Sequence, residues 1–407
     1  MISRDKSIDK IGEYFNVFKV VAILGPRQCG KSTLSRQYMQ KFKASLDQNK
    51  DVYFSPSVRI DDSENHKLSS ADVHYFDLEN ERDLFSLKEA QLTLEGLKGL
   101  IIIDEIQRRP ELFQLVRYLV DYFPQKYLIL GSASRDLIRQ SSETLAGRIG
   151  YIELTPFSSF EIPKKDIDKL WWRGGFPHSF LGSSDEMSHV WRTDYIQTFL
   201  QRDLAMMGID IEPMMMKRFW QMLAFYHGQT FHPSSISDSL GISHKTVQRY
   251  VDILEGTFMV RQLRPWTENI NKRQVRSNKI YIRDSGLLHT LWDTKSVEEL
   301  RRHPKIGASW EGFALEEIIR KHSSKECYFW STQSQSELDL LIFSGGKSYG
   351  FEFKYSTQPK ITKSMHIVMR DLNLAHLSII TPGEASYPLS EKISMNTMPS
   401  LENENNY

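Results

Sequence analysis

The chain has 407 residues, 40% of them hydrophobic, which is enough apolar material for two or three separately packed domains. Its 52 lysines and arginines nearly balance 51 aspartates and glutamates, which excludes a protein drawn to nucleic acid or membrane by its overall charge; any such surface is local. Two cysteines exclude a disulfide framework, and no apolar run approaches the roughly 20 residues of a membrane-spanning helix. The sequence therefore predicts a cytoplasmic protein with no membrane partner.

A glycine-rich segment near the N-terminus carries the first functional motif. It follows an apolar run over residues 18–24 and leads into a helix-like stretch, the context in which such a loop binds phosphate. The segment fits GxxxxGK[ST] and consists of Gly25, Pro26, Arg27, Gln28, Cys29, Gly30, Lys31 and Ser32, with Thr33 opening the helix. The loop N–H groups bind phosphate oxygens, Lys31 reaches the β- and γ-phosphates, and the Ser32 hydroxyl binds magnesium. The sequence therefore predicts a site for ATP and Mg²⁺ at residues 25–33.

A pair of acids forms the second motif. The apolar run over residues 97–103 ends in Asp104 and Glu105, which is typical of a buried parallel strand with acids at its carboxyl end. We expect Asp104 to hold the magnesium shell and Glu105 to orient or deprotonate the attacking water. The alternatives are a chance glycine loop and a strand that ends in solvated acids. The two motifs together, about 70 residues apart, favour ATP hydrolysis over both alternatives.

A short apolar strand over residues 127–130 ends in Gly131-Ser132-Ala133-Ser134. We favour Ser132 over Ser134 as the side chain that contacts the γ-phosphate or the water, because Ser132 is nearer the strand end. An ordinary strand-to-helix turn with a serine cap explains the same residues equally well.

These motifs resemble the AAA-type ATPase domain of a bacterial and archaeal family in which the ATPase is fused to a C-terminal domain of unknown function. The residues that carry the resemblance are 25–32, 101–107, 131–134, Leu-Ala-Gly-Arg at 145–148 and Leu-Thr-Pro-Phe at 154–157. The resemblance implies an AAA-type parallel sheet over residues 1–160. It also makes Arg148 the arginine that neutralises charge during phosphoryl transfer, in cis or from a neighbouring subunit; a structural arginine at a helix end is the other interpretation. Cys29 stands where such sequences carry another small residue, and it is either a thiol that makes the ATPase sensitive to modification or an inert one.

Residues 161–265 predict a helical region with a winged helix-turn-helix. A first helix over residues 234–240, a Gly-Ile turn and a second helix over 243–255 precede a wing strand at 258–263. The second helix has a buried stripe and, away from it, four side chains that a recognition helix would show to a DNA groove: His244, Lys245, Gln248 and Arg249. The same module also serves as a plain spacer between domains. The basic stretch over 261–283, which includes Lys279, either contacts phosphates or is a solvated loop.

Residues 266–395 predict a small α/β domain that resembles the restriction-endonuclease-like fold. Asp339 lies on one strand, and Glu352 and Lys354 lie on one face of its hairpin partner. In that fold Asp339 and Glu352 would bind magnesium or manganese, Lys354 would stabilise charge or orient water, and Glu311 on the preceding helix would complete the shell. A charged face on a small sheet is the alternative. Residues 396–407 predict a flexible tail.

The sequence thus predicts an ATP-hydrolysing switch or motor that acts on DNA through the winged helix and a metal-dependent, nuclease-like domain. The alternative is a nucleotide-gated scaffold for protein partners or for further copies of the chain, in which the C-terminal domain is inactive.

Overall fold

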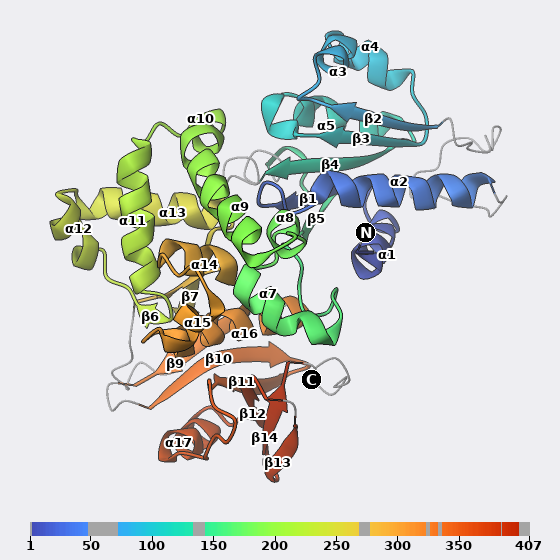
Figure 1. The fold of residues 1–407 in the computed structure, drawn as a ribbon. Coiled ribbons are helices and arrows are strands. Elements are labelled where there is room, and N and C mark those ends of the chain that lie inside the picture. Colours follow the sequence, from blue (N-terminus) through green and yellow to red (C-terminus); the bar gives the residue numbers. More distant parts are fainter. Residues whose placement is uncertain are drawn as a thin grey trace. The chain divides into compact units, whose positions relative to one another are not determined.

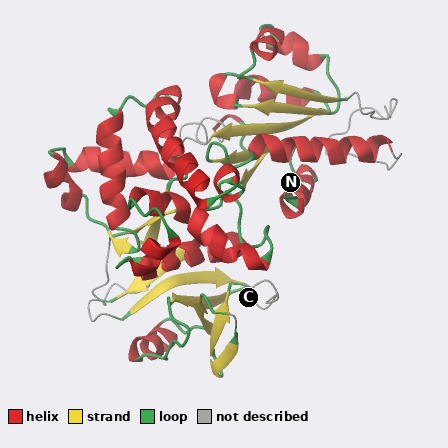
Figure 2. Ribbon diagram, viewed as in Figure 1, coloured by secondary structure: helices red, strands yellow, loops and turns green. Residues whose placement is uncertain are grey.

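A computed structural model describes residues 2–47, 72–132, 143–267, 277–322, 326–332, 336–383 and 385–398. The chain forms two compact units, unit 1 at Met1–Thr155 and unit 2 at Pro156–Tyr407. Both units combine helices with a sheet, which confirms the predicted α/β class (Figure 1, Figure 2). None of the described helices is long and apolar enough to cross a lipid bilayer.

Unit 1 is built on a five-stranded sheet in the order β2-β3-β4-β1-β5, and every neighbouring pair is parallel. The strands are β1 (Val20–Gly25), β2 (Val73–Asp77), β3 (Leu100–Asp104), β4 (Lys126–Ser132) and β5 (Ile149–Glu153). Strands β1, β3 and β4 are buried along their whole length, as their continuous apolar sequences require. The predicted parallel-sheet domain is therefore confirmed.

Helices cover this sheet because their apolar stripes need a partner. They are α1 (Asp5–Phe15), α2 (Lys31–Asp47), α3 (Glu81–Ser86), α4 (Ala90–Glu95) and α5 (Leu112–Tyr122), with a 3₁₀ turn, η1, at Ile106–Arg108. Ile11 and Phe15 of α1 and Leu34 and Tyr38 of α2 share one core with the sheet. This core fixes the start of α2 at the end of β1 (Figure 1).

The first part of unit 2 is helical. It contains α7 (Ile167–Arg173), α8 (Pro177–Phe180), α9 (Asp185–Thr198), α10 (Leu204–Met206), α11 (Pro213–Phe225), α12 (Ser234–Leu240), α13 (His244–Gly256), α14 (Ser285–Leu291), α15 (Val297–Arg302) and α16 (Ile306–His322), with a 3₁₀ turn, η2, at Lys164–Asp166 and a π-helix, η3, at Phe199–Asp203. The predicted helix pair is present as α12 and α13. Gly241 between them has a φ of 65°, which glycine adopts easily, and the Ser243 side chain accepts from the N–H of Thr246 at 3.1 Å.

A nine-stranded sheet in the order β13-β14-β12-β11-β10-β9-β7-β8-β6 runs through unit 2. Its strands are β6 (Gln229–Thr230), β7 (Val260–Pro265), β8 (Lys279–Ile282), β9 (Cys327–Ser331), β10 (Glu337–Ser344), β11 (Lys347–Phe353), β12 (His376–Thr381), β13 (Tyr387–Ser390) and β14 (Ile393–Thr397), with helix α17 at Lys363–Asp371. Because β7 pairs with β9 through Arg264 and Tyr328, the boundary predicted at 265/266 lies inside one sheet.

Two further predictions concern the C-terminal tail and Ser134. Residues 396 and 397 were expected to begin a flexible tail, but they belong to β14, where Asn396 and Thr397 are buried. This part of the prediction is wrong because the sheet pairs the backbone of a polar segment that has no apolar pattern. Residues 399–407 lie outside the described part of the chain, as does Ser134.

Candidate active site

The carboxyl ends of β1, β3 and β4 meet at one edge of the unit 1 sheet, because neighbouring strands run parallel. Strand β4 lies between the other two, and its last residue, Ser132, pairs with Gly25 at the end of β1. Asp104 ends β3. The phosphate loop, the acid pair and Ser132 therefore lie at the same edge, where open α/β sheets bind their ligands.

The loop at residues 25–33 turns from the end of β1 into the first turn of α2. Gln28 and Gly30 have positive φ angles of 60° and 102°. Lys31 is only 5% exposed, and its Nζ donates to the carbonyl oxygens of Gly25 at 3.0 Å and Pro26 at 2.9 Å. These acceptors are neutral, so a phosphate oxygen would make the stronger, charge-assisted bond to the same ammonium group.

Glu105 follows β3 in a left-handed backbone conformation with a φ of 56° and a ψ of 43°. Gln107 Nε2 donates to Glu105 Oε2 and also, at 2.9 Å, to Ser132 Oγ. Ser132 Oγ lies 3.4 Å from the same Glu105 oxygen. Burial raises the pKa of the Glu105 carboxyl above its ordinary value, although the positive charge of Lys31 opposes the shift. A carboxylate with a raised pKa at a ligand-binding edge is suited to accept a proton.

Asp104 is fixed by two hydrogen bonds that leave it at the sheet edge. One carboxylate oxygen accepts from Tyr75 Oη at 2.6 Å, and the other accepts from the N–H of Glu105 at 2.9 Å. The described residues contain no group of three His, Cys, Asp or Glu side chains that could hold a metal ion. Mg²⁺ nevertheless fits here, because it takes few protein ligands beside substrate phosphates and water, and Ser32 and Asp104 offer the hard oxygen atoms that it prefers.

Two side chains of the phosphate loop, those of Cys29 and Arg27, are engaged in contacts within the protein. Cys29 is fully buried, its thiol donates to the carbonyl of Leu154 at 3.4 Å, and burial raises its pKa, so the inert interpretation of this cysteine is favoured. Arg27 forms an ion pair with Glu79 at 2.9 Å. The Arg4 guanidinium, which sequence analysis did not single out, donates to the carbonyls of Cys29 at 3.2 Å and Thr155 at 2.9 Å and so braces the loop.

Arg148 lies at the opposite edge of the sheet. Its carbonyl accepts from the N–H of Val20, the first residue of β1, at 3.2 Å, and its guanidinium forms a bidentate pair with Asp121 of α5 at 2.7 and 3.0 Å. Six residues of β1 separate the two edges, which corresponds to roughly 16 Å or more. A role in cis does not fit this position, because the arginine precedes β5 rather than following a strand. A role in trans stays a prediction.

A second polar cluster lies in unit 2, and we call Lys279, Glu311, Glu337, Asp339, Glu352 and Lys354 the acid–lysine cluster. Lys354 Nζ lies 2.7 Å from Glu352 Oε2 and 3.8 Å from Asp339 Oδ2. The other Asp339 oxygen lies 3.8 Å from Lys279 Nζ. The four residues predicted from sequence, Glu311, Asp339, Glu352 and Lys354, are thus part of one cluster.

Lys279 corrects an expectation. It was assigned to a basic stretch that contacts phosphate or solvent, but its side chain is 4% exposed and faces carboxylates on two other elements. Its Nζ forms an ion pair with Glu337, and it lies 3.6 Å from Glu311 Oε1. The cause is that β8 belongs to the nine-stranded sheet and not to a loop. Nothing in the local sequence marks Lys279, since its partners lie at least thirty positions along the chain.

The pKa values of two glutamates in the acid–lysine cluster are raised, because buried carboxyl groups lie close to one another there. Burial and the neighbouring Asp339 charge raise the pKa of Glu311 to about 7 and that of Glu352 to about 8. Tyr281 Oη also donates to Glu311 Oε1 at 2.6 Å. The two lysines therefore offset only part of the effect of burial and of crowded carboxylates on the pKa values of these two glutamates.

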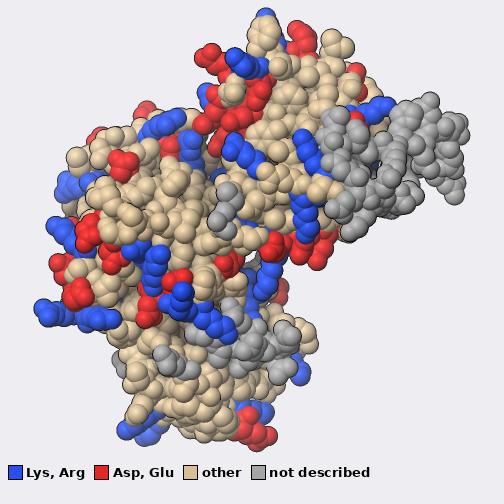
Figure 3. All heavy atoms as spheres, turned by 45° about the vertical axis from the view of Figure 1, so that its right-hand side comes forward, with Lys and Arg blue, Asp and Glu red and all other residues tan. Residues whose placement is uncertain are grey.

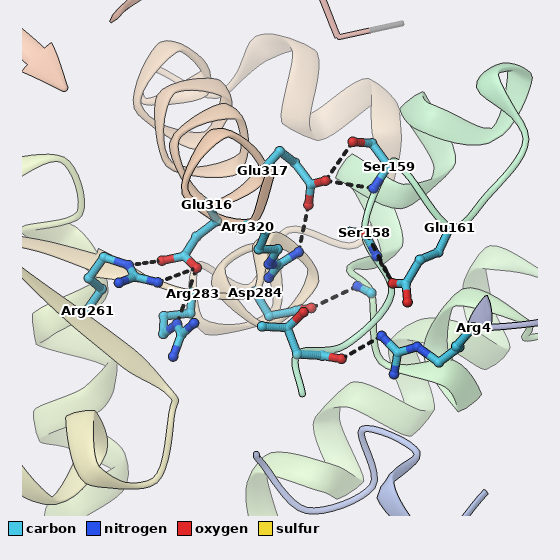
Figure 4. A network of polar contacts seen from close by, with 12 residues as sticks. Arg4, Ser158, Ser159, Glu161, Arg261, Arg283, Asp284, Glu316, Glu317 and Arg320 are labelled. Atoms are coloured by element: carbon cyan, nitrogen blue, oxygen red, sulfur yellow. Dashed lines mark hydrogen bonds and ion pairs between the residues drawn. The ribbon is translucent and has the colours of Figure 1, made fainter. Parts of the chain in front are cut away.

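A further buried network in unit 2 is structural (Figure 4). Glu316 accepts from Arg261 and Arg283, and these two cations hold its pKa below the ordinary range despite burial. Glu317 accepts from the N–H and hydroxyl of Ser159, both at 2.6 Å, and from an arginine on its own helix. Each charge is matched by a partner in place, so no ligand is needed to explain the network.

The side chains expected to contact DNA lie on the exposed face of α13. His244, Lys245, Gln248 and Arg249 are all exposed, whereas the predicted stripe of α13 is buried. Lysines, arginines and acids are interspersed over the face drawn in Figure 3.

Three domain families match the chain. An AAA domain matches residues 17–162, a domain of unknown function (DUF8612) matches residues 164–298, and a second domain of unknown function (DUF4143) matches residues 306–401. Among solved structures, the Walker-type ATPase paby2304 of Pyrococcus abyssi superposes with a TM-score of 0.44 at 16% identity, over 72% of this chain and 96% of that one.

Two mycobacterial proteins are similar over nearly the whole chain. They are the uncharacterized proteins Rv2008c of Mycobacterium tuberculosis and Mb2031c of Mycobacterium bovis. Each is 43% identical over 395 residues, which cover 97% of this chain and 83% of the relative. This chain combines an AAA domain with a C-terminal domain of unknown function (DUF4143), and it belongs to the family of these mycobacterial proteins.

Proposed function

We propose that the protein is a magnesium-dependent ATPase that works as a switch or motor. The observation that carries this proposal is that Lys31, at the start of α2 after β1, lies with Asp104 and Glu105, at the end of β3, at one carboxyl edge of the sheet. A cation without a carboxylate partner among the described residues, beside a base with a raised pKa, suits a site that binds phosphates and activates water.

Each residue has a defined part in this proposal. The loop N–H groups and Lys31 bind the phosphates, and Ser32 and Asp104 would hold magnesium, which neutralises phosphate charge when bound. Glu105 orients the attacking water and accepts its proton. The hydrogen bond from Tyr75 holds the Asp104 carboxylate in place for magnesium, so that Glu105 is the acid left to activate water.

The test is ATP hydrolysis by purified protein and by the variants Lys31→Ala and Glu105→Gln. We expect Lys31→Ala to lose nucleotide binding by about 10²-fold or more, and Glu105→Gln to bind ATP without turning it over. Lys41→Ala is a matched control, because Lys41 lies on the same helix but pairs with Asp9 on the surface. Normal turnover by Glu105→Gln would contradict the assignment of the base.

DNA is the partner that we propose for this ATPase. The support is the order α11, β6, α12, α13, β7, β8, which is that of a winged helix, together with the four exposed polar side chains of α13. We expect duplex DNA to raise ATP turnover. The double variant Lys245→Ala/Arg249→Ala should lower the slope of log affinity against log salt concentration by about two, because two phosphate contacts are lost.

A matched control for this experiment is Lys217→Ala/Arg218→Ala on α11, where both side chains are also exposed. Equal losses in the two double variants would mean that the binding is unspecific attraction to positive charge. Turnover that ignores DNA, with a stable protein complex instead, would support the scaffold alternative.

Metal-dependent cleavage of nucleic acid is the second candidate function. It is favoured by the contacts among Asp339 of β10, Glu352 of β11 and Lys354, which directly follows β11, in the element order α16-β9-β10-β11-α17-β12. The test is a cleavage assay with magnesium or manganese. Cleavage that disappears in Asp339→Asn supports this function, and intact DNA with the native protein rejects it, leaving the acid–lysine cluster as a structural feature.

A further inference from the structure

Gln107 ties together the two polar side chains that follow β3 and end β4. Its Nε2 donates to Glu105 Oε2 and to Ser132 Oγ, the latter at 2.9 Å. Because a carboxylate can only accept, the amide nitrogen is the end of Gln107 that faces Glu105. Gln107 therefore bridges the proposed base to the strand that lies next to the phosphate loop strand.

The backbone conformation of Glu105 explains why a neighbouring side chain, that of Gln107, is needed to hold its carboxylate in place. Glu105 has a positive φ, which costs a residue with a side chain about 1 kcal/mol or more and persists only when its surroundings fix it. The turn η1 follows at once, with the N–H of Arg108 donating to the carbonyl of Glu105 at 3.0 Å. This turn brings Gln107 back beside the side chain of Glu105, two residues earlier.

The other end of the amide carries a separate observation. Gln107 Oε1 is buried and accepts no hydrogen bond from any residue that the structure describes. An acceptor of this kind, beside the carboxylate that orients water, is available to an O–H donor at the reaction site.

We propose that Gln107 is the positioning residue of the hydrolytic site: its amide holds the Glu105 carboxylate against Ser132, in the orientation from which Glu105 activates water. This inference rests on the proposed ATPase function. Gln107 is uncharged and supplies its donor to Glu105, so it contributes to turnover through the base and not to the binding of phosphate.

The test compares Gln107→Met with the native protein. We expect kcat to fall by about 10²-fold, the effect of a misplaced catalytic group, while the affinity for a non-hydrolysable ATP analogue changes less than about twofold. A residue that acted in phosphate binding would lower the affinity for the analogue together with kcat, so the two measurements separate a positioning role from a binding role.

Two further variants keep the test sharp. Gln107→Glu has the same shape but places a second carboxylate against Glu105, and we expect a similar loss of kcat; it also serves if Gln107→Met does not fold. Gln114→Met is the matched control, because Gln114 is an exposed glutamine on α5, and it should behave as the native protein.

The outcomes separate this inference from the function on which it rests. A native protein that does not hydrolyse ATP would overturn the ATPase proposal and this inference with it. Native turnover with an unchanged kcat in folded Gln107→Met would overturn only the role of Gln107. A loss of analogue binding in Gln107→Met would also overturn it, because the residue would then act in binding.

Discussion

The two polar sites of the molecule treat charge in opposite ways. At the unit 1 sheet edge, the Lys31 ammonium donates hydrogen bonds only to neutral carbonyls among the described residues, and Glu105 accepts them only from neutral side chains, so that Lys31 and Glu105 influence one another without forming an ion pair. In the acid–lysine cluster of unit 2, ammonium groups lie directly against carboxylates. A charged group with only neutral hydrogen-bond partners can exchange them for a ligand. Charged groups that already neutralise one another contribute mainly to the stability of the fold.

This difference implies that the same kind of substitution should have different consequences in the two units. Removal of a charge at the sheet edge should change ligand binding or turnover and leave stability nearly intact. Removal of a charge from the acid–lysine cluster should change stability. All eight tryptophans lie beyond residue 156, so tryptophan fluorescence follows the unfolding of unit 2 in the full chain.

The largest effect is expected for Lys279→Met. The substitution keeps most of the side-chain volume but leaves buried carboxylates without their cation, which costs about 3–5 kcal/mol for one partner of a buried pair. Urea unfolding at neutral pH, followed by tryptophan fluorescence, measures the loss. The control is Lys295→Met, an exposed lysine of the same unit, where we expect less than about 0.5 kcal/mol. Equal midpoints for both variants would show that the cluster does not support the fold.

The partners of Lys279 show where sequence analysis reaches its limit. The acids at 339 and 352 and Lys354 were found because they lie on a hairpin, whose alternation can be read locally. Lys279 comes from β8, which joins the same sheet through β7 and β9. That order of strands depends on long-range packing, and a single sequence holds no signal for it.

The unit 1 site was predictable to a greater extent, for the same physical reason. Parallel strands place their carboxyl ends at one edge, so the motifs after β1, β3 and β4 had to meet. Tyr75 and Gln107 were missed. The partner of Tyr75 became visible only when β2 paired with β3, and that of Gln107 only when Glu105 took its left-handed conformation. The position of Gln107 within residues 101–107, which carry the family resemblance, is the one signal that pointed to it.

A pH series gives the next largest effect. The carboxyl group of Glu352 on β11 lies near Asp339 of β10 and near Lys354, which directly follows β11. Lys279 of β8 and Glu311 of α16 belong to the same cluster. Its pKa in the folded protein is about 8, above the ordinary 4.5. The folded state therefore binds the proton more tightly, and stability falls as pH rises from about 5 to about 8. Glu311, with a pKa of about 7, acts in the same direction.

The variant Glu352→Gln should remove part of this dependence, because glutamine cannot ionise. We expect it to be less sensitive than the native protein over the same pH interval, with a difference of up to a few kcal/mol at the alkaline end. Glu298→Gln, an exposed acid on α15, is the control and should keep the native slope. A parallel course of the native and Glu352→Gln midpoints between about pH 5 and 8 would mean that Glu352 is ionised throughout.

The smallest effect is expected for one of the ion pairs of unit 1, that between Arg148 and Asp121. This pair is exposed and lies at the edge away from the phosphate loop, so Arg148→Ala and Asp121→Ala should each change stability by about 1 kcal/mol or less. Both variants should keep the native kcat in dilute solution, where copies of the chain do not meet. A loss of kcat in Arg148→Ala alone, present only at protein concentrations that favour association, would show that the arginine acts on a neighbouring copy. The same loss at every concentration would contradict its position at the far edge, because only an arginine beside the phosphate loop of its own chain can act independently of concentration.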